Sequence, residues 1–170
     1  MTILGKKQMS EEDIKLNYIT PVILKGWKGH ITMETKITDG RINIRGNIVA
    51  RSKPKFADYM LYLNDGKPLA VVEAKDNNHS VSHGLQQAMT YAQMMDLPFA
   101  YSSNGDAFYE HDFLTGQEQQ IDLDKFPTQD ELVARYYAEL NGGKGISDTE
   151  KRILYLADRN ILVDQSILQD

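Results

Sequence analysis

The 170-residue sequence predicts an α/β fold in which a mixed β-sheet is flanked by helices. Two pairs of apolar segments with alternating polar residues are each joined by a turn sequence, which is typical of paired β-strands. A segment with helical apolar spacing follows the second pair, and strand-like and helical segments alternate after it. A chain of this length fits one domain that buries about two thirds of its unfolded surface.

The first expected element is a helix that begins at residues 10–13. Their sequence, Ser-Glu-Glu-Asp, has the form of an N-terminal cap followed by an acid three residues later, and apolar residues come next. Pro21 permits at most a kinked continuation toward Trp27. Gly26 and Gly29 then mark a turn.

The expected sheet consists of two hairpins followed by two further strands. The first hairpin pairs residues 31–37 with 42–49 around the glycine-containing turn 38–40, and the second pairs 56–63 with 69–75 around the turn 64–67. Segment 69–75 is apolar on both faces, which predicts a central strand. Because strand side chains alternate, Glu73 and Lys75 share a face with Leu69 and Val71. The remaining expected elements are a helix at 81–95, strands at 99–102 and 107–111, and a helix at 129–140.

The composition excludes several kinds of site. There is no cysteine, and therefore no disulfide, no thiolate nucleophile and no cysteine-bound zinc. Any metal must bind carboxylates, carbonyls or histidine, and hard oxygen ligands indicate magnesium. No apolar run approaches ~20 residues, and the first residues lack the apolar core of a signal peptide, so we expect a cytoplasmic protein.

The net charge of −5 hides an uneven distribution of charge along the chain. Residues 1–56 contain 11 Lys and Arg against 5 Asp and Glu, whereas residues 57–170 contain 8 against 19. The basic half could contact phosphates on either side of a cleaved bond, and a solvated charged hairpin is an equally good interpretation. The candidate DNA-binding residues are Arg41, Arg45, Arg51, Lys53 and Lys55.

Two carboxylates and one ammonium can meet at the ends of the second strand pair. Asp58 lies on the first strand, and Glu73 and Lys75 lie at the end of the second, so antiparallel pairing brings positions 58 and 73 together. Two ionised carboxylates ~4 Å apart repel by about 4 kcal/mol at an effective dielectric near 20, which a magnesium ion would neutralise. The alternative is that Glu73 forms an ordinary ion pair. The same Glu-x-Lys pattern occurs at Glu34, but no aspartate-bearing strand precedes that copy.

The following helix supplies polar residues on a different face from its apolar stripe. His83, Gln87 and Tyr91 are spaced four residues apart, so this polar edge can face the strand ends. His79 and His83 have helical spacing that zinc could use, but the loop-like sequence around them favours surface histidines.

Together, Asp58, Glu73 with Lys75, and Gln87 with Tyr91 resemble the core of PD-(D/E)xK nucleases with an additional glutamine and tyrosine motif. The wider sequence from about residue 10 to 140 resembles the N-terminal nuclease region of type I restriction enzyme R subunits. Alanine stands at position 57, where the superfamily name has proline, but the metal ligand is the aspartate that follows. The segments that carry the wider resemblance are 38–42, 57–59, 70–75, 84–88 and 99–105.

The resemblance implies a restriction-endonuclease-like core and magnesium-dependent cleavage of double-stranded DNA, with Mn²⁺ as a substitute ion. It implies that Asp58 and Glu73 bind the metal, that the carbonyl of Ala74 is a third ligand, and that Lys75 faces the attacking water. It also implies methyltransferase and specificity subunits as partners.

The resemblance assigns supporting roles to four further residues. Gln87 and Tyr91 would orient either DNA or the catalytic lysine. Glu11 or Glu12 would add a metal ligand from the first helix, although charges at a helix N-terminus already explain both.

The C-terminal residues 151–165 resemble motif Ia of the helicase motor that follows the nuclease in R subunits. A Walker A loop precedes that motif in the family, but here residues 141–145 (NGGKG) lack its Gly-Lys-Ser/Thr ending. We therefore expect an endonuclease domain at 1–145 and a linker with a motor fragment at 146–170, without an ATP site. ATP use would belong to the full-length family enzyme.

Two alternative functions remain open from the sequence. The chain could be a module of the same fold that binds DNA or docks subunits without cutting. It could also be a stand-alone DNA-repair nuclease, which the motor-like tail disfavours.

Overall fold

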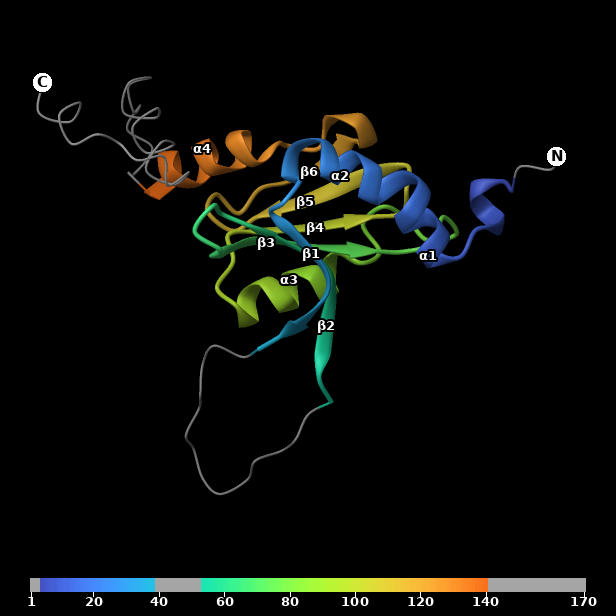
Figure 1. Ribbon diagram of the computed structural model, residues 1–170, viewed down its shortest axis with the longest axis horizontal. Helices are drawn as coiled ribbons and strands as arrows, with labels where there is room; N and C mark the ends of the chain where they lie inside the picture. Colours follow the sequence, from blue (N-terminus) through green and yellow to red (C-terminus); the bar gives the residue numbers. More distant parts are fainter. Residues whose placement is uncertain (1–3, 39–52, 141–170) are drawn as a thin grey trace, which may run out of the picture.

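The computed structural model of the chain describes residues 4–38 and 53–140. A six-stranded sheet forms its centre, with the strands side by side in the order β1 to β6 (Figure 1). Neighbouring strands are antiparallel except β3 and β4, which are parallel. The predicted mixed sheet is therefore confirmed. Its strands are β1 (Ile31–Ile37), β2 (Lys55–Tyr62), β3 (Pro68–Ala74), β4 (Phe99–Ser103), β5 (Ala107–Asp112) and β6 (Glu118–Asp122).

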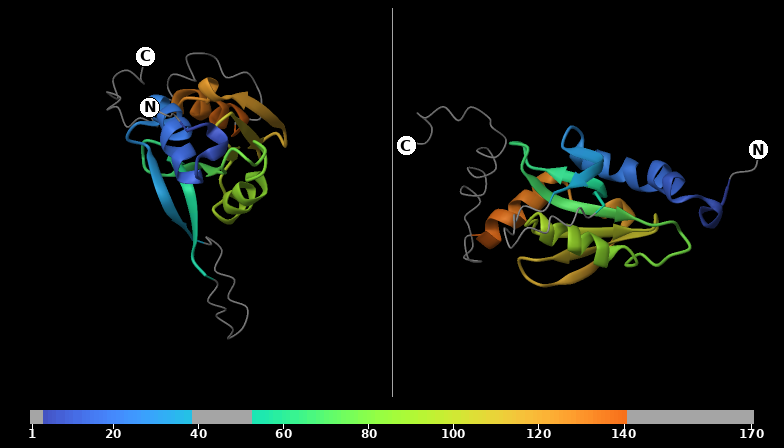
Figure 2. Two further views of the ribbon diagram at one scale, coloured as in Figure 1. Left: turned by 90° about the vertical axis from the view of Figure 1, so that its right-hand side faces the viewer. Right: turned by 90° about the horizontal axis from the view of Figure 1, so that it is seen from below.

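Helices cover both faces of the sheet (Figures 1 and 2). The N-terminal helices and α4 share a core cluster with one face, while α3 packs on the opposite face. The helices are α1 (Glu11–Ile14), the π-helical turn η2 (Lys15–Ile19), α2 (Thr20–Trp27), α3 (Leu85–Met94) and α4 (Gln129–Leu140), with short 3₁₀ turns η1 (Lys6–Gln8) and η3 (Leu123–Lys125). No helix among the described residues is long and apolar enough to cross a membrane.

The predicted helix start is confirmed as a capping box. The Asp13 amide donates to the Ser10 hydroxyl at 3.1 Å, and the Ser10 amide donates to the Asp13 carboxylate at 3.1 Å. The helical run continues through the π-helical turn, and Pro21 lies in the first turn of α2, where its missing N–H costs little. Helical structure therefore reaches Trp27, as expected.

Gly26 does not mark a turn as predicted, because it lies inside α2. A Cβ at this position would lie 2.9 Å from the Thr128 Cα, so the glycine lets α2 approach the start of α4 closely. The neighbouring Trp27 is fully buried and donates its indole N–H to the Pro127 carbonyl at 2.9 Å. Gly29, with φ of 83°, does form the turn into β1.

The strand β3 is central and buried along its length, as predicted. Val71 packs against α3, while Ala70, Val72 and Ala74 pack in the opposite core. Leu69 was expected to share the face of Val71, but it packs in the opposite core. The pairing of β2 with β3 shifts register just before this point, which breaks the regular alternation.

Three further features of the structure were not expected from the sequence. The partner of β1 in the described sheet is β2, and the predicted arm 42–49 lies outside the described residues. The helix expected from 81 begins at Leu85, because residues 81–84 form a turn. The edge strand β6 was not predicted, since its polar sequence shows no apolar alternation.

Candidate active site

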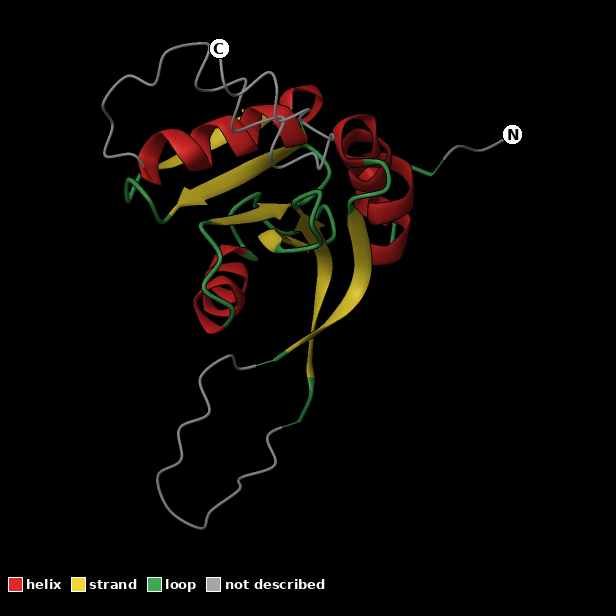
Figure 3. Ribbon diagram, turned by 60° about the vertical axis from the view of Figure 1, so that its left-hand side comes forward, coloured by secondary structure: helices red, strands yellow, loops and turns green. Residues whose placement is uncertain are grey.

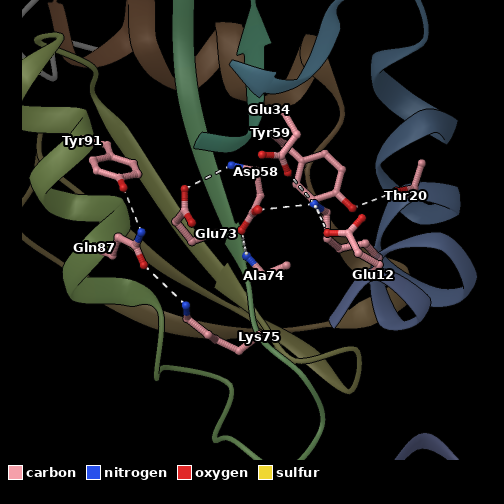
Figure 4. Close-up of polar contacts among 11 residues, drawn as sticks. Glu12, Thr20, Glu34, Asp58, Tyr59, Glu73, Ala74, Lys75, Gln87 and Tyr91 are labelled. Carbon is pink, nitrogen blue, oxygen red and sulfur yellow. Dashed lines mark hydrogen bonds and ion pairs between the residues drawn. The ribbon is translucent and has the colours of Figure 1, made fainter. Parts of the chain in front are cut away.

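The antiparallel register of β2 and β3 brings Asp58 and Glu73 together. Tyr59 pairs with Val72, so the preceding residue of β2 lies opposite the following residue of β3. The Asp58 amide donates to the Glu73 carboxylate at 3.2 Å. The Asp58 carboxylate in turn accepts the Ala74 amide at 2.8 Å. Two reciprocal contacts thus fix both carboxyl groups at the same place (Figure 4).

Ionisation of Glu73 is unfavourable beside Asp58. Glu73 is buried, and this burial, together with the charge of Asp58 and a side-chain hydrogen bond with it, raises the pKa of Glu73 to about 9. Lys75 opposes this shift only in part. In the metal-free chain at neutral pH, Glu73 is therefore protonated. A cation bound beside Asp58 and Glu73 would instead balance the negative charge of the ionised Glu73 carboxylate.

Lys75 is held beside the carboxylates by the polar edge of α3. Its ammonium donates to the Gln87 side-chain oxygen at 3.4 Å, and the Gln87 amide donates to the Tyr91 hydroxyl at 2.8 Å. Tyr91 is buried, so it anchors this chain of contacts from the core side. The structure therefore joins the predicted glutamine and tyrosine to the lysine (Figure 4).

Close packing at the start of α3 also positions Lys75. A Cβ at Gly84 would lie 3.0 Å from the Ser102 hydroxyl oxygen and 3.4 Å from both the Glu73 Cβ and the Lys75 Cε. The Gly84 amide donates to the Ser102 hydroxyl at 3.0 Å, and this hydroxyl donates to the Val81 carbonyl at 2.7 Å. Because Gly84 has no side chain, the start of α3 can pack closely against Ser102, Glu73 and Lys75.

Sequence reasoning missed Lys15, whose side chain is 1% exposed. Its ammonium lies 3.3 Å from Asp58, 2.9 Å from Glu34 and 3.1 Å from Glu12. Burial lowers the pKa of Lys15, but hydrogen bonds to Glu34 and Glu12 outweigh this and hold it above its ordinary value. A lysine on an amphipathic helix gives no sequence signal that it will be buried.

Glu34 belongs to the Glu-x-Lys copy that the sequence placed outside the site. It lies opposite Asp58, because Met33 pairs with Tyr59 and Thr35 pairs with Ala57. Its φ of 49° is unusual for a residue other than glycine. Only the pairing of β1 with β2 reveals that this acid reaches the site.

The two candidate acids of the first helix have different surroundings. Glu12 is largely exposed and pairs with Lys15. Glu11 is half-buried, and burial and the nearby charge of Asp58 raise its pKa, while Lys75 and Lys15 lower it. Glu11 therefore shares the electrostatic environment of the candidate site, which favours it over Glu12 as an additional ligand.

The candidate DNA-binding residues are only partly described. Lys55 begins β2, Lys53 lies two residues before it, and both are exposed. The paired strands β1 and β2 extend together away from the helices (Figure 3). Arg41, Arg45 and Arg51 lie outside the described residues.

His79 and His83 lie with their ring centroids 4.3 Å apart, and His79 contacts Asp76 at 3.1 Å. His83 precedes α3, so it does not continue the helical edge formed by Gln87 and Tyr91 as predicted.

A second buried cluster of charges lies away from these residues. Arg135 on α4 contacts Glu110 at 2.8 and 2.9 Å and Asp112 at 2.9 Å, and Tyr101 donates to Glu110 at 2.6 Å. A surface groove of about 640 Å³ between β6 and α4 is lined in part by Arg135 and by none of the site residues. We interpret this cluster as the connection that fixes α4 to the sheet.

A magnesium ion fits the donor set of the candidate site. Asp58 and Glu73 offer hard oxygen ligands, and the raised pKa of Glu73 indicates a position where a bound cation would favour the ionised carboxylate. Within residues 4–38 and 53–140, no three histidine or acidic side chains are grouped as metal ligands. An ion here would therefore depend on the two carboxylates, a backbone carbonyl and water, which is common for magnesium.

Comparisons with known proteins identify the family of this chain. Residues 27–127 match the family model described as "Type I restriction enzyme R protein N terminus". The chain belongs to this family. A curated relative, the type I restriction enzyme EcoAI endonuclease subunit of Escherichia coli, is 33% identical over 235 residues and covers 98% of this chain. A solved fragment of an HsdR subunit of a type I restriction enzyme from Vibrio vulnificus YJ016 is 41% identical, with a TM-score of 0.64 over 82% of this chain.

The chain spans only part of these longer proteins. It corresponds to 29% of the length of the Escherichia coli subunit and 27% of the Vibrio vulnificus chain. The aligned stretch of 235 residues is longer than the 170 residues of this chain, so the relative contains residues there without a counterpart in this chain. The solved relative also supports the restriction-endonuclease-like fold predicted from the sequence.

Proposed function

We propose that this chain is the magnesium-dependent nuclease domain of a type I restriction enzyme R subunit and hydrolyses phosphodiester bonds of double-stranded DNA. The observation that carries the proposal is the close approach of Asp58 and Glu73, where burial and the charge of Asp58 raise the pKa of Glu73 and a divalent ion would favour its ionised form. Membership of the R protein family supports it independently.

Asp58, Glu73 and the carbonyl of Ala74 would hold the metal ion. The hydrogen bonds between strands fix the first two carboxyl groups before any ion binds, so little reorganisation is needed. Glu11 is the further carboxylate that its electrostatic surroundings favour. When bound, the ion would polarise the phosphoryl group and lower the pKa of a bound water.

Lys75 acts on the charge that develops during hydrolysis. Its ammonium lies at the end of β3, where it can stabilise the pentacovalent phosphate and hold the attacking water. Gln87 orients this ammonium, and Tyr91 holds Gln87 in turn. These contacts favour orientation of the lysine over direct contact with DNA as the role of the glutamine and tyrosine.

The exposed residues Lys53 and Lys55 would bind the DNA backbone beside the cleaved bond, together with Arg41, Arg45 and Arg51. Such contacts are independent of base sequence, so sequence recognition would come from a separate specificity subunit. A methyltransferase subunit is the other expected partner. We place the domain in the cytoplasm, and manganese is expected to replace magnesium.

We propose that residues 146–170 are a fragment of the motor that follows the nuclease in longer R subunits. The resemblance of residues 151–165 to motif Ia of that motor supports this assignment. Without a Walker A loop, this chain is expected to have no ATPase activity of its own.

Cleavage of supercoiled plasmid in Mg²⁺ or Mn²⁺ tests the proposed activity. We expect nicked and linear DNA with the wild-type chain, and at least 100-fold less with Lys75→Met. Lys125→Met is the matched control, because Lys125 is 72% exposed and far from the site in the fold. The alternative of a non-cutting module predicts retarded DNA in a gel-shift assay with no cleavage in either ion.

A further inference from the structure

The ammonium of Lys15 is placed like a second cation at the candidate site. Three carboxylates from three separate elements surround it, namely Glu12 on α1, Glu34 on β1 and Asp58 on β2. An ammonium has three N–H donors, and the three contacts of 2.9–3.3 Å use one donor each. Its hydrogen-bonding capacity is therefore filled.

The side chain is also enclosed to an unusual degree for a lysine. Only 1% of it is exposed, and its ammonium lies 5.7 Å from the ring centre of Tyr59. A buried lysine is stable only when its charge is paired. The three carboxylates therefore stabilise the buried ammonium, and the ammonium fixes the positions of the three carboxylates.

The backbone at Glu34 is strained where this contact forms. Its φ of 49° occurs in the middle of β1, directly opposite Asp58, and its carboxylate makes the shortest of the three contacts with Lys15. Strain of this kind is unfavourable and is concentrated at functional sites. The surrounding structure thus keeps Lys15 in contact with Glu12, Glu34 and Asp58 despite the strained backbone at Glu34.

Asp58 has one carboxylate oxygen on each side of this arrangement. Its Oδ1 faces the Lys15 ammonium, and its Oδ2 accepts the Ala74 amide beside Glu73. In nucleases with two metal ions, the ions lie about 3.5–4 Å apart. A second ion bound through Oδ1 of Asp58 would need the space that the Lys15 ammonium fills.

We propose that Lys15 takes the place of a second divalent ion, so that the site binds a single ion beside a fixed ammonium. This inference rests on the magnesium site proposed above. Lys15 acts through Asp58 and is therefore a positioning residue: it balances one oxygen of Asp58 while the other side of the carboxylate is turned toward the ion.

Removing the charge of Lys15 should create room for a second ion. The side chains of Glu12 and Glu34 are 74% and 60% exposed, so their carboxylates can move from ammonium contact distances to the shorter distances of metal ligands. Lys15→Gln keeps a hydrogen-bond donor without the charge, and Lys15→Met removes both. Lys125→Gln is the matched control on an exposed lysine.

The test is electron paramagnetic resonance of Mn²⁺ titrated into the full chain, with stoichiometry from calorimetry and folding checked by circular dichroism. We expect one uncoupled ion in the wild type and in Lys125→Gln. We expect two ions with a spin-coupled spectrum in Lys15→Gln and Lys15→Met. A merely structural lysine would change stability without changing the number of ions.

Several results would overturn the inference. A spin-coupled pair in the wild type would do so even if both Lys15 variants failed to fold, and it would leave the proposed nuclease function standing. Folded variants that still bind one ion would also reject it. A wild-type chain that binds no ion at this site would instead remove the proposed magnesium site, and this inference with it.

Discussion

The raised pKa of Glu73 predicts how the stability of the folded chain depends on pH. In the unfolded chain this carboxyl ionises near its ordinary value of 4.5, whereas in the folded, metal-free chain its pKa is about 9. Between these two pH values the folded state binds the extra proton, so stability falls as pH rises. The free energy of unfolding decreases by 2.303RT for each pH unit, so we expect a loss on the order of 6 kcal/mol between pH 4.5 and about 9.

Glu73→Gln should remove this pH dependence. Glutamine has the shape of the protonated glutamate and can keep the contact with the Asp58 amide, so we expect it to match the wild type at pH 5. It should become the more stable of the two as the pH approaches 9. Glu139→Gln, at an exposed position of α4, is the control and should follow the wild-type curve.

Urea unfolding in the presence of a chelator measures the effect directly. Trp27 is the single tryptophan and is fully buried, so its fluorescence reports unfolding. Magnesium added at pH 8 should restore stability to the wild type but not to Glu73→Gln, because the ion replaces the proton. Parallel stability curves for the wild type and Glu73→Gln from pH 5 to 9 would refute this reasoning.

Two further substitutions test how the site and the fold are held together. Gly84→Ala adds a methyl group 3.0 Å from the Ser102 hydroxyl and 3.4 Å from Lys75. We expect a loss of about 1–2 kcal/mol in stability, measured by thermal unfolding, and a decrease in DNA cleavage that is larger than the loss of folded protein explains. Unchanged cleavage would contradict the role of this packing. Arg135→Met leaves the buried Glu110 carboxylate without its counter-charge and should cost about 3 kcal/mol in urea unfolding, while magnesium binding stays intact.

The central pair of the site could be predicted from sequence because its geometry is local. A tight turn joins the two strands, so antiparallel pairing brings the positions at their far ends close together. Asp58 and Glu73 therefore meet within one hairpin. Gln87 and Tyr91 follow from simple helical spacing on the next element.

The Lys15 cluster could not be predicted, because three distant segments create it. Burial of a lysine is unfavourable until Glu12, Glu34 and Asp58 converge on it, and no single segment shows that they will. The position of Glu34 depends on the pairing of β1 with β2, which the sequence assigned to a different hairpin arm.

The edge strand β6 and the packing of Leu69 were missed for different reasons. The sequence of β6 is polar because the strand lies at the edge of the sheet, where apolar alternation is not required. A register shift at the start of β3 changes the face of Leu69, and such irregularities leave no clear pattern in the sequence.

The most direct measurement is anomalous diffraction from crystals of this chain soaked in Mn²⁺. We predict a peak about 2.0–2.6 Å from carboxylate oxygens of both Asp58 and Glu73, on the side of the pair that faces Lys75. A peak that contacts only one of these carboxylates, or density elsewhere with none between them, would contradict the proposal that the pair holds the catalytic ion.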